Sequence, residues 1–464
     1  MAETTRVLPM PDIGFRAIAR LASPILVANI SILGSGTIDT VMAGRLGAEH
    51  LAAVAIGNAT VVMVLMTLVG VIQSLSPLAG HHFCAQRFER IGFELTQSLW
   101  LSLVLSVIGF ALLSYTDFWV ALCNAKGNVA DMLRIYLFAS ALSVPAFMLS
   151  RPYVALNAAI NLPQVTMWVS VGLLVVKFPL NAIFMYGLLG MPALGGGGAG
   201  VASALGATLS LVALYGYWRF AKVYDRVRPA RFYLPNLSAI ATHLKIGIPI
   251  SFSMFFEISC FAMMAILIGR IGTVDVAAHQ IVSNATSFIF QIPLSLGIAV
   301  SVLVAQCLGA GSPKMAREAM FRVIRLALCV AAVTSSSLFI FRDFVVNFYT
   351  TDASVAALAK SLLAVALIFH VADALQTTSC FALRGYRVTF LPMVIYGVLL
   401  WSVGLGGGCW LGFSAEIIGG PFGAHGFWAA TATGIILVSV AIGSYAVYIA
   451  KDRLSDERVQ KKNF

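Results

Sequence analysis

The sequence predicts an all-α membrane protein with twelve transmembrane helices, arranged as two similar six-helix bundles. Apolar residues make up 59% of the 464 residues and charged residues only 11%, against roughly 45–50% and roughly 25% in soluble domains. Twelve apolar segments reach about 20 residues, the length that a helix needs to cross a bilayer. The second half of the chain also repeats features of the first, in the same order.

The predicted spans are apolar segments separated by short polar stretches. The first could be mistaken for a signal peptide, but about twenty residues separate its start from Asp39, more than the roughly 7–15 residues of a signal sequence core. The twelve spans are predicted at 17–42, 52–77, 95–115, 132–152, 164–186, 198–221, 243–269, 277–303, 321–341, 355–382, 391–413 and 425–450.

The most polar internal stretch lies between the sixth and seventh predicted spans and is rich in basic residues. We interpret it as a linker between two halves. The predicted domains are therefore an N-terminal lobe at 1–221, a basic cytoplasmic linker at 222–242 and a C-terminal lobe at 243–464.

An internal repeat supports this division. The stretch VMAGRLGAEHLAAVAIGNAT at 41–60 matches LIGRIGTVDVAAHQIVSNAT at 267–286. Because six helices separate the two copies, both enter the membrane from the same side. This is a parallel repeat, with its pseudo-symmetry axis along the membrane normal, as in transporters built from two bundles.

The basic residues predict the orientation of the chain. Alternate loops on one side carry 23 lysines and arginines and those on the other side carry 6. Cytoplasmic loops are enriched in these residues, so both termini are predicted to be cytoplasmic. The net charge of +11 then reflects membrane topology. No basic stripe with interleaved aromatic residues is present, so we expect no nucleic-acid partner.

Three acidic residues lie well inside predicted spans: Asp39, Glu257 and Asp373. A charged side chain in the bilayer costs roughly 2.5–3.5 kcal/mol on insertion scales, and such residues commonly mark ion or substrate pathways. The alternative is that each only makes a structural hydrogen bond between helices. We favour a functional role because hydrocarbon requires that each charge be neutralised or protonated.

Two basic or titratable residues accompany these acids. Lys177 lies about 13 residues from one end of its predicted span, which is deep for a lysine that reaches back to the membrane surface. His370 lies one helical turn before Asp373 and is either a proton relay or ligand, or a buried histidine held by ordinary hydrogen bonds.

Other motifs exclude several classes of protein. The run GGGGAG at 195–200 formally fits a nucleotide-binding pattern, but no strand precedes it, so it is predicted to be the turn that opens the sixth helix. Seven cysteines without a CxxC pair indicate neither a zinc site nor a disulfide framework. An intramembrane aspartyl protease needs YD and GxGD motifs in spans, and this pair is missing. We expect no enzyme activity and no cofactor.

Several motifs in one order resemble the multidrug and toxic compound extrusion (MATE) family, in particular its NorM-like branch. They are TIDTVMAGRLGAEHLAAVAIG at 37–57, FPLNAIFMYG at 178–187, LGGGGAGVA at 194–202, VAAHQ at 276–280, AVSVLVAQCLGAG at 299–311 and LRGY at 383–386. The resemblance implies a V-shaped fold of two six-helix lobes. It also implies an antiporter that expels lipophilic, often cationic drugs in exchange for H⁺ or Na⁺.

The resemblance also assigns roles to residues. Asp39 matches the family's first-helix acid, Glu257 and Asp373 match the acids of helices seven and ten, and Asn181 matches an asparagine of helix five. A Na⁺ site is implied at Glu257 and Asp373. Where NorM-like sequences tend to carry another asparagine, four residues before Asn181, this chain has Lys177.

This departure motivates a specific hypothesis. At 1.5 Å per residue, Asp39 lies about 26 Å along its span when counted from Ala22, and Lys177 about 20 Å along its own when counted from Gln164. The difference of about 6 Å is within reach of a lysine side chain. We therefore predict that Lys177 pairs with Asp39 and supplies the positive charge that Na⁺ would otherwise bring.

The sequence thus favours a monomeric multidrug antiporter of the inner cell membrane, whose partners are lipophilic cationic drugs, a coupling cation and the lipid bilayer. The alternative is a flippase or exporter of a lipid-linked or polar substrate in a related twelve-helix family. A phosphate-bearing substrate would need a cationic cavity. We expect only Lys177 to be basic inside the membrane, which disfavours this alternative.

Overall fold

A computed structural model describes residues 10–229, 231–414 and 416–462 of the chain. In these ranges the chain is helical with connecting turns, and twelve helical segments are long and apolar enough to cross a membrane. Each predicted span lies within one of these segments or extends past its end by a single residue. The predicted fold class is therefore confirmed. Helices suit this setting because each satisfies its own backbone hydrogen bonds where no water is present.

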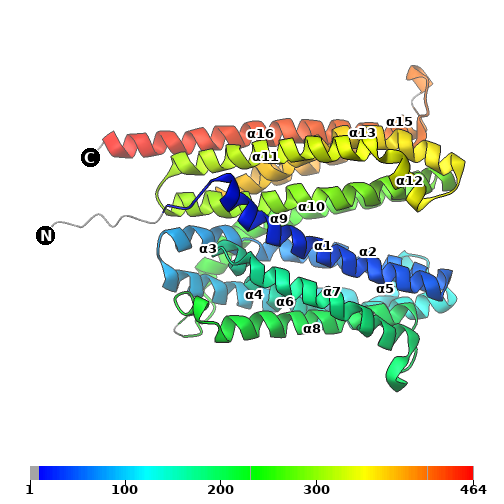
Figure 1. The fold of residues 1–464 in the computed structure, drawn as a ribbon, viewed down its shortest axis with the longest axis horizontal. Coiled ribbons are helices and arrows are strands. Elements are labelled where there is room, and N and C mark those ends of the chain that lie inside the picture. Colours follow the sequence, from blue (N-terminus) through cyan, green and yellow to red (C-terminus); the bar gives the residue numbers. More distant parts are fainter. Residues whose placement is uncertain (1–9, 230, 415, 463–464) are drawn as a thin grey trace. The chain divides into compact units, whose positions relative to one another are not determined.

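The first six spans are formed by α1 to α8, with α5 as a short helix between two spans (Figure 1). Their bounds are α1 Phe15–Leu46, α2 Ala48–Ile72, α3 Leu75–Cys84, α4 Phe88–Ser114, α5 Thr116–Leu122, α6 Gly127–Ala159, α7 Pro163–Tyr186 and α8 Gly196–Phe220. The second span contains both α2 and α3, because the chain turns at Gln73–Ser74.

The last six spans are formed by α9 to α16, with α12 as a second short helix between spans. Their bounds are α9 Leu237–Gly269, α10 Thr273–Gly309, α11 Pro313–Ile340, α12 Arg342–Tyr349, α13 Ala353–Gly385, α14 Phe390–Ile395, α15 Gly407–Phe413 and α16 Gly423–Lys462. The eleventh span continues from α14 into α15 through the π-helical segment η3, Tyr396–Gly406. Short 3₁₀ turns in the described ranges are η1 Leu188–Gly190, η2 Lys222–Tyr224 and η4 Glu416–Ile418.

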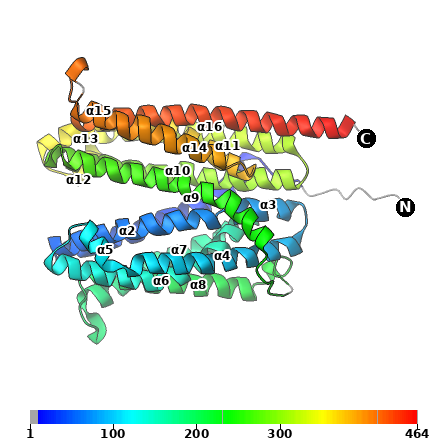
Figure 2. The ribbon, with the colours of Figure 1, turned by 180° about the vertical axis from the view of Figure 1, so that it is seen from behind.

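The chain forms two compact units, each described by itself. One unit holds residues 23–251, and in it α6 packs against α2, α4 and α8 (Figure 2). The other holds the described residues up to 22 and from 252 onward, and in it α13 packs against α10, α11 and α16. These limits fall inside α1 and α9, whereas the lobes were predicted to end at the linker. The predicted lobe limits therefore stay a prediction.

The described residues of the stretch 222–242, which was predicted to be a linker, are folded onto the 23–251 unit. Tyr224 is fully buried and its hydroxyl donates to Asn157 Oδ1 at 2.6 Å, and this burial raises the pKa of Tyr224. Arg228 donates to the carbonyl oxygens of Trp218 and Ala221 at 2.9 and 3.1 Å. The segment is thus part of a compact unit, and its last residues, from Leu237 on, form the start of α9.

The glycine-rich run opens α8, as predicted, and it does so to allow close helix contact. A Cβ atom on Gly198 would lie 2.3 Å from the carbonyl oxygen of Phe184 on α7, and one on Gly200 would lie 2.7 Å from the backbone of Tyr136 on α6. Only glycine permits such backbone contact. The run therefore sets the position of α8 against α6 and α7.

We expect Gly198→Ala to lower the stability of the protein by about 1–3 kcal/mol, because the added methyl group overpacks a rigid backbone contact. The measurement is the apparent midpoint of thermal unfolding in detergent at a fixed heating rate. Gly206→Ala on the same helix is the matched control, since a Cβ atom there meets nothing within 4 Å. Equal midpoints for the two variants would contradict the packing role of Gly198.

Candidate functional site

The first polar site lies in the 23–251 unit, between α1 and α7. Lys177 Nζ lies 3.0 Å from Asp39 Oδ1, and Asn181 Nδ2 donates to the same oxygen at 2.6 Å. Asp39 and Lys177 are each 6% exposed and Asn181 is fully buried. The ion pair predicted between Lys177 and Asp39 is therefore present.

The Lys177 ammonium has further acceptors on α8. It donates to Ser203 Oγ and also approaches the carbonyl oxygen of Ala199 at 3.4 Å. An ammonium group has three hydrogen atoms, and Asp39, Ser203 and Ala199 provide three acceptors. The lysine is thus held by protein acceptors, and together with Asp39 it forms a neutral unit.

One acceptor in this site has no partner among the described residues, namely Asn181 Oδ1. A buried acceptor without a donor costs about 1–3 kcal/mol. Two serines that precede Asp39 on α1, Ser31 and Ser35, do not donate to this oxygen. They donate instead to backbone oxygens one turn earlier on α1.

The second polar site lies in the other unit, between α9, α13 and η3. Asp373 is 5% exposed and accepts a hydrogen bond from Gln376 Nε2 at 3.1 Å. The hydroxyl of Tyr396 donates to Gln376 Oε1 and so fixes the orientation of that amide. Glu257 on α9 lies close enough to Asp373 for the two carboxylate charges to interact.

Sequence reasoning missed one member of this site. Arg384 lies two residues beyond the tenth predicted span, and the sequence therefore places it among the 23 basic residues of the cytoplasmic loops. In the structure it lies in α13 and is only 7% exposed. Its charge interacts with that of Glu257, and its guanidinium carbon stands 3.9 Å above the ring centre of Phe381. The expectation that Lys177 alone is basic inside the spans was therefore wrong. The missed signal is the spacing, since Arg384 follows Asp373 by about three helical turns and so shares its helix face.

The structure places His370 away from the acid beside it in sequence. His370 is 1% exposed, and its Nε2 lies 3.2 Å from Thr334 Oγ1 on α11. No hydrogen bond or ion pair joins it to Asp373 among the described residues. This arrangement favours the structural interpretation of His370 over the relay.

The described residues contain no group of three or more histidine, cysteine or acidic side chains that could hold a metal ion. A Na⁺ ion at the second site would rely on fewer carboxylates. Glu257 and Asp373 offer two, and the Thr377 hydroxyl, which also bonds Asp373, offers a neutral oxygen. Oxygen ligands of this kind suit a hard cation.

Comparison with known proteins shows two matches to a single family model, MatE, at residues 24–183 and 249–408. The probable multidrug resistance protein NorM of Aromatoleum aromaticum is 35% identical over 443 residues, covering 94% of this chain and 95% of that protein. The multidrug resistance protein NorM of Vibrio vulnificus strain YJ016 is 32% identical, covering 92% and 94%.

The chain belongs to the MATE family. Its fold agrees, because the crystal structure of the eukaryotic MATE transporter AtDTX14 superposes with a TM-score of 0.84 at 20% identity, covering 95% of this chain and 98% of that one. Members of this family are transporters, so this MATE protein is not an enzyme. The predicted family and the predicted absence of enzyme activity are thereby confirmed.

The two family matches begin at residues 24 and 249, which confirms the internal repeat of this MATE transporter. The ionisable residues do not follow the repeat. The shift from 24 to 249 carries Asp39 onto Met264, and in reverse it carries Glu257 onto Ile32 and Asp373 onto Met148. The two halves therefore share a backbone plan but hold different polar chemistry.

Proposed function

We propose that this MATE transporter exports lipophilic, often cationic drugs in exchange for H⁺ or Na⁺, and that the coupling cation binds at Glu257 and Asp373. The observation that supports this most is the balance of charge in the two sites. Asp39 and Lys177 neutralise each other at 3.0 Å. In the second site one base, Arg384, stands with the two acids Glu257 and Asp373, which leaves one negative charge when these three groups are ionised.

A single buried negative charge is a site for one monovalent cation. Burying it without a partner is costly, so the carboxylates take up a proton, a Na⁺ ion or a cationic drug. Only one of these can balance the charge at a time. The coupling ion and the drug therefore weaken each other's binding, as antiport requires.

The electrical driving force is adequate for this exchange. One charge moved through 100 mV yields roughly 2.3 kcal/mol, which sustains a concentration ratio of some tens. The relatives at 35% and 32% identity are named multidrug resistance proteins, which supports drugs as the substrates. In the Asp39 site the ammonium of Lys177 occupies the position of a cation, so we assign coupling to the Glu257–Asp373 site alone.

The alternative, export of a lipid-linked or polar substrate, receives little support from the basic residues. Arg384 adds a buried basic group that the sequence reasoning had placed outside the membrane. Both it and Lys177 nevertheless face acids, Lys177 facing Asp39 and Arg384 interacting with Glu257. Neither of these two is left to bind a phosphate group, and Arg151 of α6 lies over the ring of Phe147 and donates to Ser150.

We further propose that the protein lies in the inner cell membrane as a monomer with both termini cytoplasmic. The support for this orientation is the distribution of basic residues, 23 against 6. Arg6, which is one of the 23, lies outside the described residues. Arg384 is buried in α13, and without it the bias of 22 against 6 still favours this orientation. Helices α1 to α8 and α9 to α16 would form the two lobes.

The test is transport of a fluorescent cationic dye into or out of proteoliposomes with a Na⁺ gradient or a pH gradient imposed separately. We expect at least one gradient to drive dye movement against its own gradient, and dye movement to dissipate that ion gradient in return. Equal dye distribution under both gradients, with correctly folded protein present, would contradict cation-coupled drug transport. Transport driven only by a lipid-linked substrate would support the alternative.

A further inference from the structure

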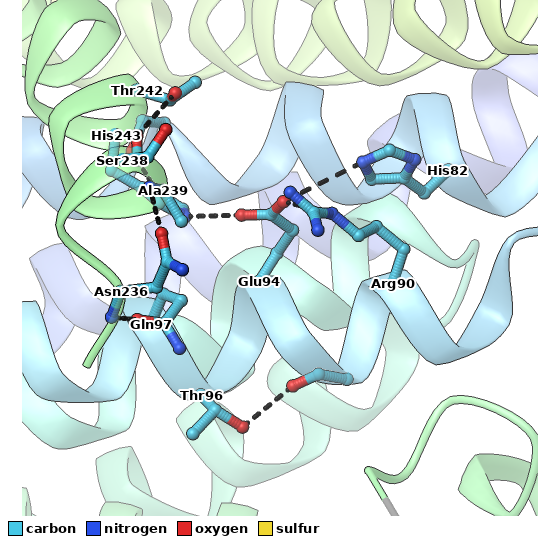
Figure 3. Close-up of polar contacts among 12 residues, drawn as sticks. His82, Arg90, Glu94, Thr96, Gln97, Asn236, Ser238, Ala239, Thr242 and His243 are labelled. Atoms are coloured by element: carbon cyan, nitrogen blue, oxygen red, sulfur yellow. Dashed lines mark hydrogen bonds and ion pairs between the residues drawn. The ribbon is translucent and has the colours of Figure 1, made fainter. Parts of the chain in front are cut away.

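A second buried ionisable cluster lies in the 23–251 unit, outside both sites described above. It consists of Glu94 on α4, His243 on α9 and Ser74 at the start of α3. Glu94 is 4% exposed, and His243 and Ser74 are fully buried. Figure 3 shows Glu94 directed toward both His243 and the Arg90 side chain. The function proposed above does not use any of these residues.

The contacts form a chain from α3 to α4 through the imidazole ring. His243 Nε2 lies 3.1 Å from Glu94 Oε2, and His243 Nδ1 lies 2.9 Å from Ser74 Oγ. The Ser74 hydroxyl also donates to the carbonyl oxygen of Val71 at 2.7 Å. The other carboxylate oxygen of Glu94 accepts from Arg90 Nε at 3.0 Å.

Counting hydrogen atoms shows what this arrangement requires. A serine hydroxyl has one hydrogen, and Ser74 gives it to Val71, so its oxygen accepts from Nδ1–H of His243. An ionised Glu94 accepts only, so Nε2 must also carry a hydrogen. All the hydrogen bonds are made together when His243 is protonated on both nitrogens. When that proton is lost, one of two hydrogen bonds is lost with it. Either the Ser74 hydroxyl turns from Val71 to Nδ1 of His243, or Glu94 no longer accepts from Nε2.

The cluster anchors one end of a particular helix. Asn236, just before α9, donates its backbone N–H to Gln97 Oε1 on α4 at 2.7 Å. A Cβ atom on Gly247 would lie 2.4 Å from the carbonyl oxygen of Val71, and one on Gly70 would lie 2.5 Å from the Cα atom of Ser251. The first four turns of α9 are therefore fitted directly onto α2 and α4.

The same helix then leaves this unit. The boundary between the two units falls after Ser251, two residues beyond Pro249 in the interior of α9. Proline lacks an N–H and is a common point for a helix to bend. Glu257 follows His243 on the same helix by about four turns, or about 21 Å.

We propose that Glu94, His243 and Ser74 form a proton-binding latch that holds the first half of α9 on the 23–251 unit. With the proton bound the latch is closed. Loss of the proton removes the positive charge that pairs His243 with Glu94 and costs the cluster one hydrogen bond, and this loosens residues 237–251. Because α9 also carries Glu257, the latch controls how readily that carboxylate moves during transport. This last step rests on the function proposed above, whereas the latch itself does not.

The charged and titratable groups around the latch are few. Arg90 of α4 contacts Glu94, and His82 of α3 has its Nε2 3.9 Å from Glu94 Oε1. On α2 the ionisable residues are Glu49 and His50, at its opposite end. On α9 the nearest is Lys245, which is exposed. The ring of His81 on α3 lies 5.7 Å from that of His82, and exposed Glu89 on α4 accepts from the Tyr233 hydroxyl. The proton therefore enters a region where Glu94 is the buried acidic group and Arg90 already bonds one of its oxygens.

The test is hydrogen–deuterium exchange of the full-length protein in lipid nanodiscs, followed for peptides that cover residues 237–251. After correction for intrinsic exchange, we expect protection in the wild type to fall about two- to tenfold between about pH 6 and about pH 8.5, the effect of one hydrogen bond. His243→Asn, whose amide can still donate to Glu94 but does not titrate in this range, should lose this pH dependence.

Two further variants make the result decisive. Ser74→Ala removes the hydrogen bond between the Ser74 hydroxyl and His243 Nδ1, while His243 still contacts Glu94. This variant should show a smaller change of protection with pH. His279→Asn is the matched control, since His279 is a buried histidine that contacts Ser283 and Trp428 on other parts of the protein, and it should behave as the wild type. A pH-independent wild type, or unchanged pH dependence in His243→Asn, would overturn the latch. If deuterium exchange follows the prediction but the protein transports no dye, the latch stands and the proposed function is overturned.

Discussion

Replacing Glu257 by glutamine or Asp373 by asparagine should abolish cation-coupled drug efflux, while the protein still inserts and folds. Each amide keeps the size and much of the hydrogen-bonding shape of the acid but removes one negative charge. With Arg384 present, the site then carries no net charge and has no need of a cation. The measurement is dye efflux from proteoliposomes, with thermal unfolding recorded for each variant to show that folding is intact.

The matched control is Glu318→Gln on α11, because Glu318 forms a partly exposed pair with Arg322 at 3.8 Å. Such surface pairs contribute about 0–1 kcal/mol, so efflux should stay at the wild-type level. Normal efflux in both Glu257→Gln and Asp373→Asn would show that the coupling site lies elsewhere. Loss of efflux in only one of the two would restrict the coupling role to that carboxylate.

Replacing Lys177 by asparagine should destabilise the protein by about 3–5 kcal/mol in Na⁺-free medium, because it leaves Asp39 as a buried charge without its partner. The asparagine also restores the residue type expected in NorM-like relatives. An amide oxygen can coordinate Na⁺, whereas an ammonium cannot. We therefore expect Na⁺, but not an equal concentration of choline, to recover part of the lost thermal stability.

Lys360→Asn provides the comparison for an ion pair in water. Lys360 Nζ lies 2.7 Å from Asp343 Oδ1, and the two side chains are 33% and 68% exposed, so its loss should change stability by less than about 1 kcal/mol. The double variant Asp39→Asn with Lys177→Met removes both buried charges and should recover most of the stability. Unchanged stability of Lys177→Asn without Na⁺ would contradict the role that we assign to this pair.

The sequence by itself determined the class of the protein and the depth of its acids. Hydropathy located the twelve spans because a lipid-exposed segment must be continuously apolar and helical. It also identified Asp39, Glu257 and Asp373, since a charge in the middle of an apolar run is conspicuous. Counting residues along straight helices placed Asp39 and Lys177 at similar depths, and so their pairing was predictable although they lie far apart in the sequence.

Only the tertiary structure decided which polar groups at the ends of the spans are buried and what they meet. Glu94, His243 and Arg384 lie within two residues of predicted span limits, where a hydropathy pattern cannot distinguish a solvated side chain from a buried one. Their burial depends on neighbouring helices, such as α2 and α9, which meet at Gly70 and Gly247. Depth follows from position in the chain, but the direction of a side chain around its helix has meaning only once the packing partner is known.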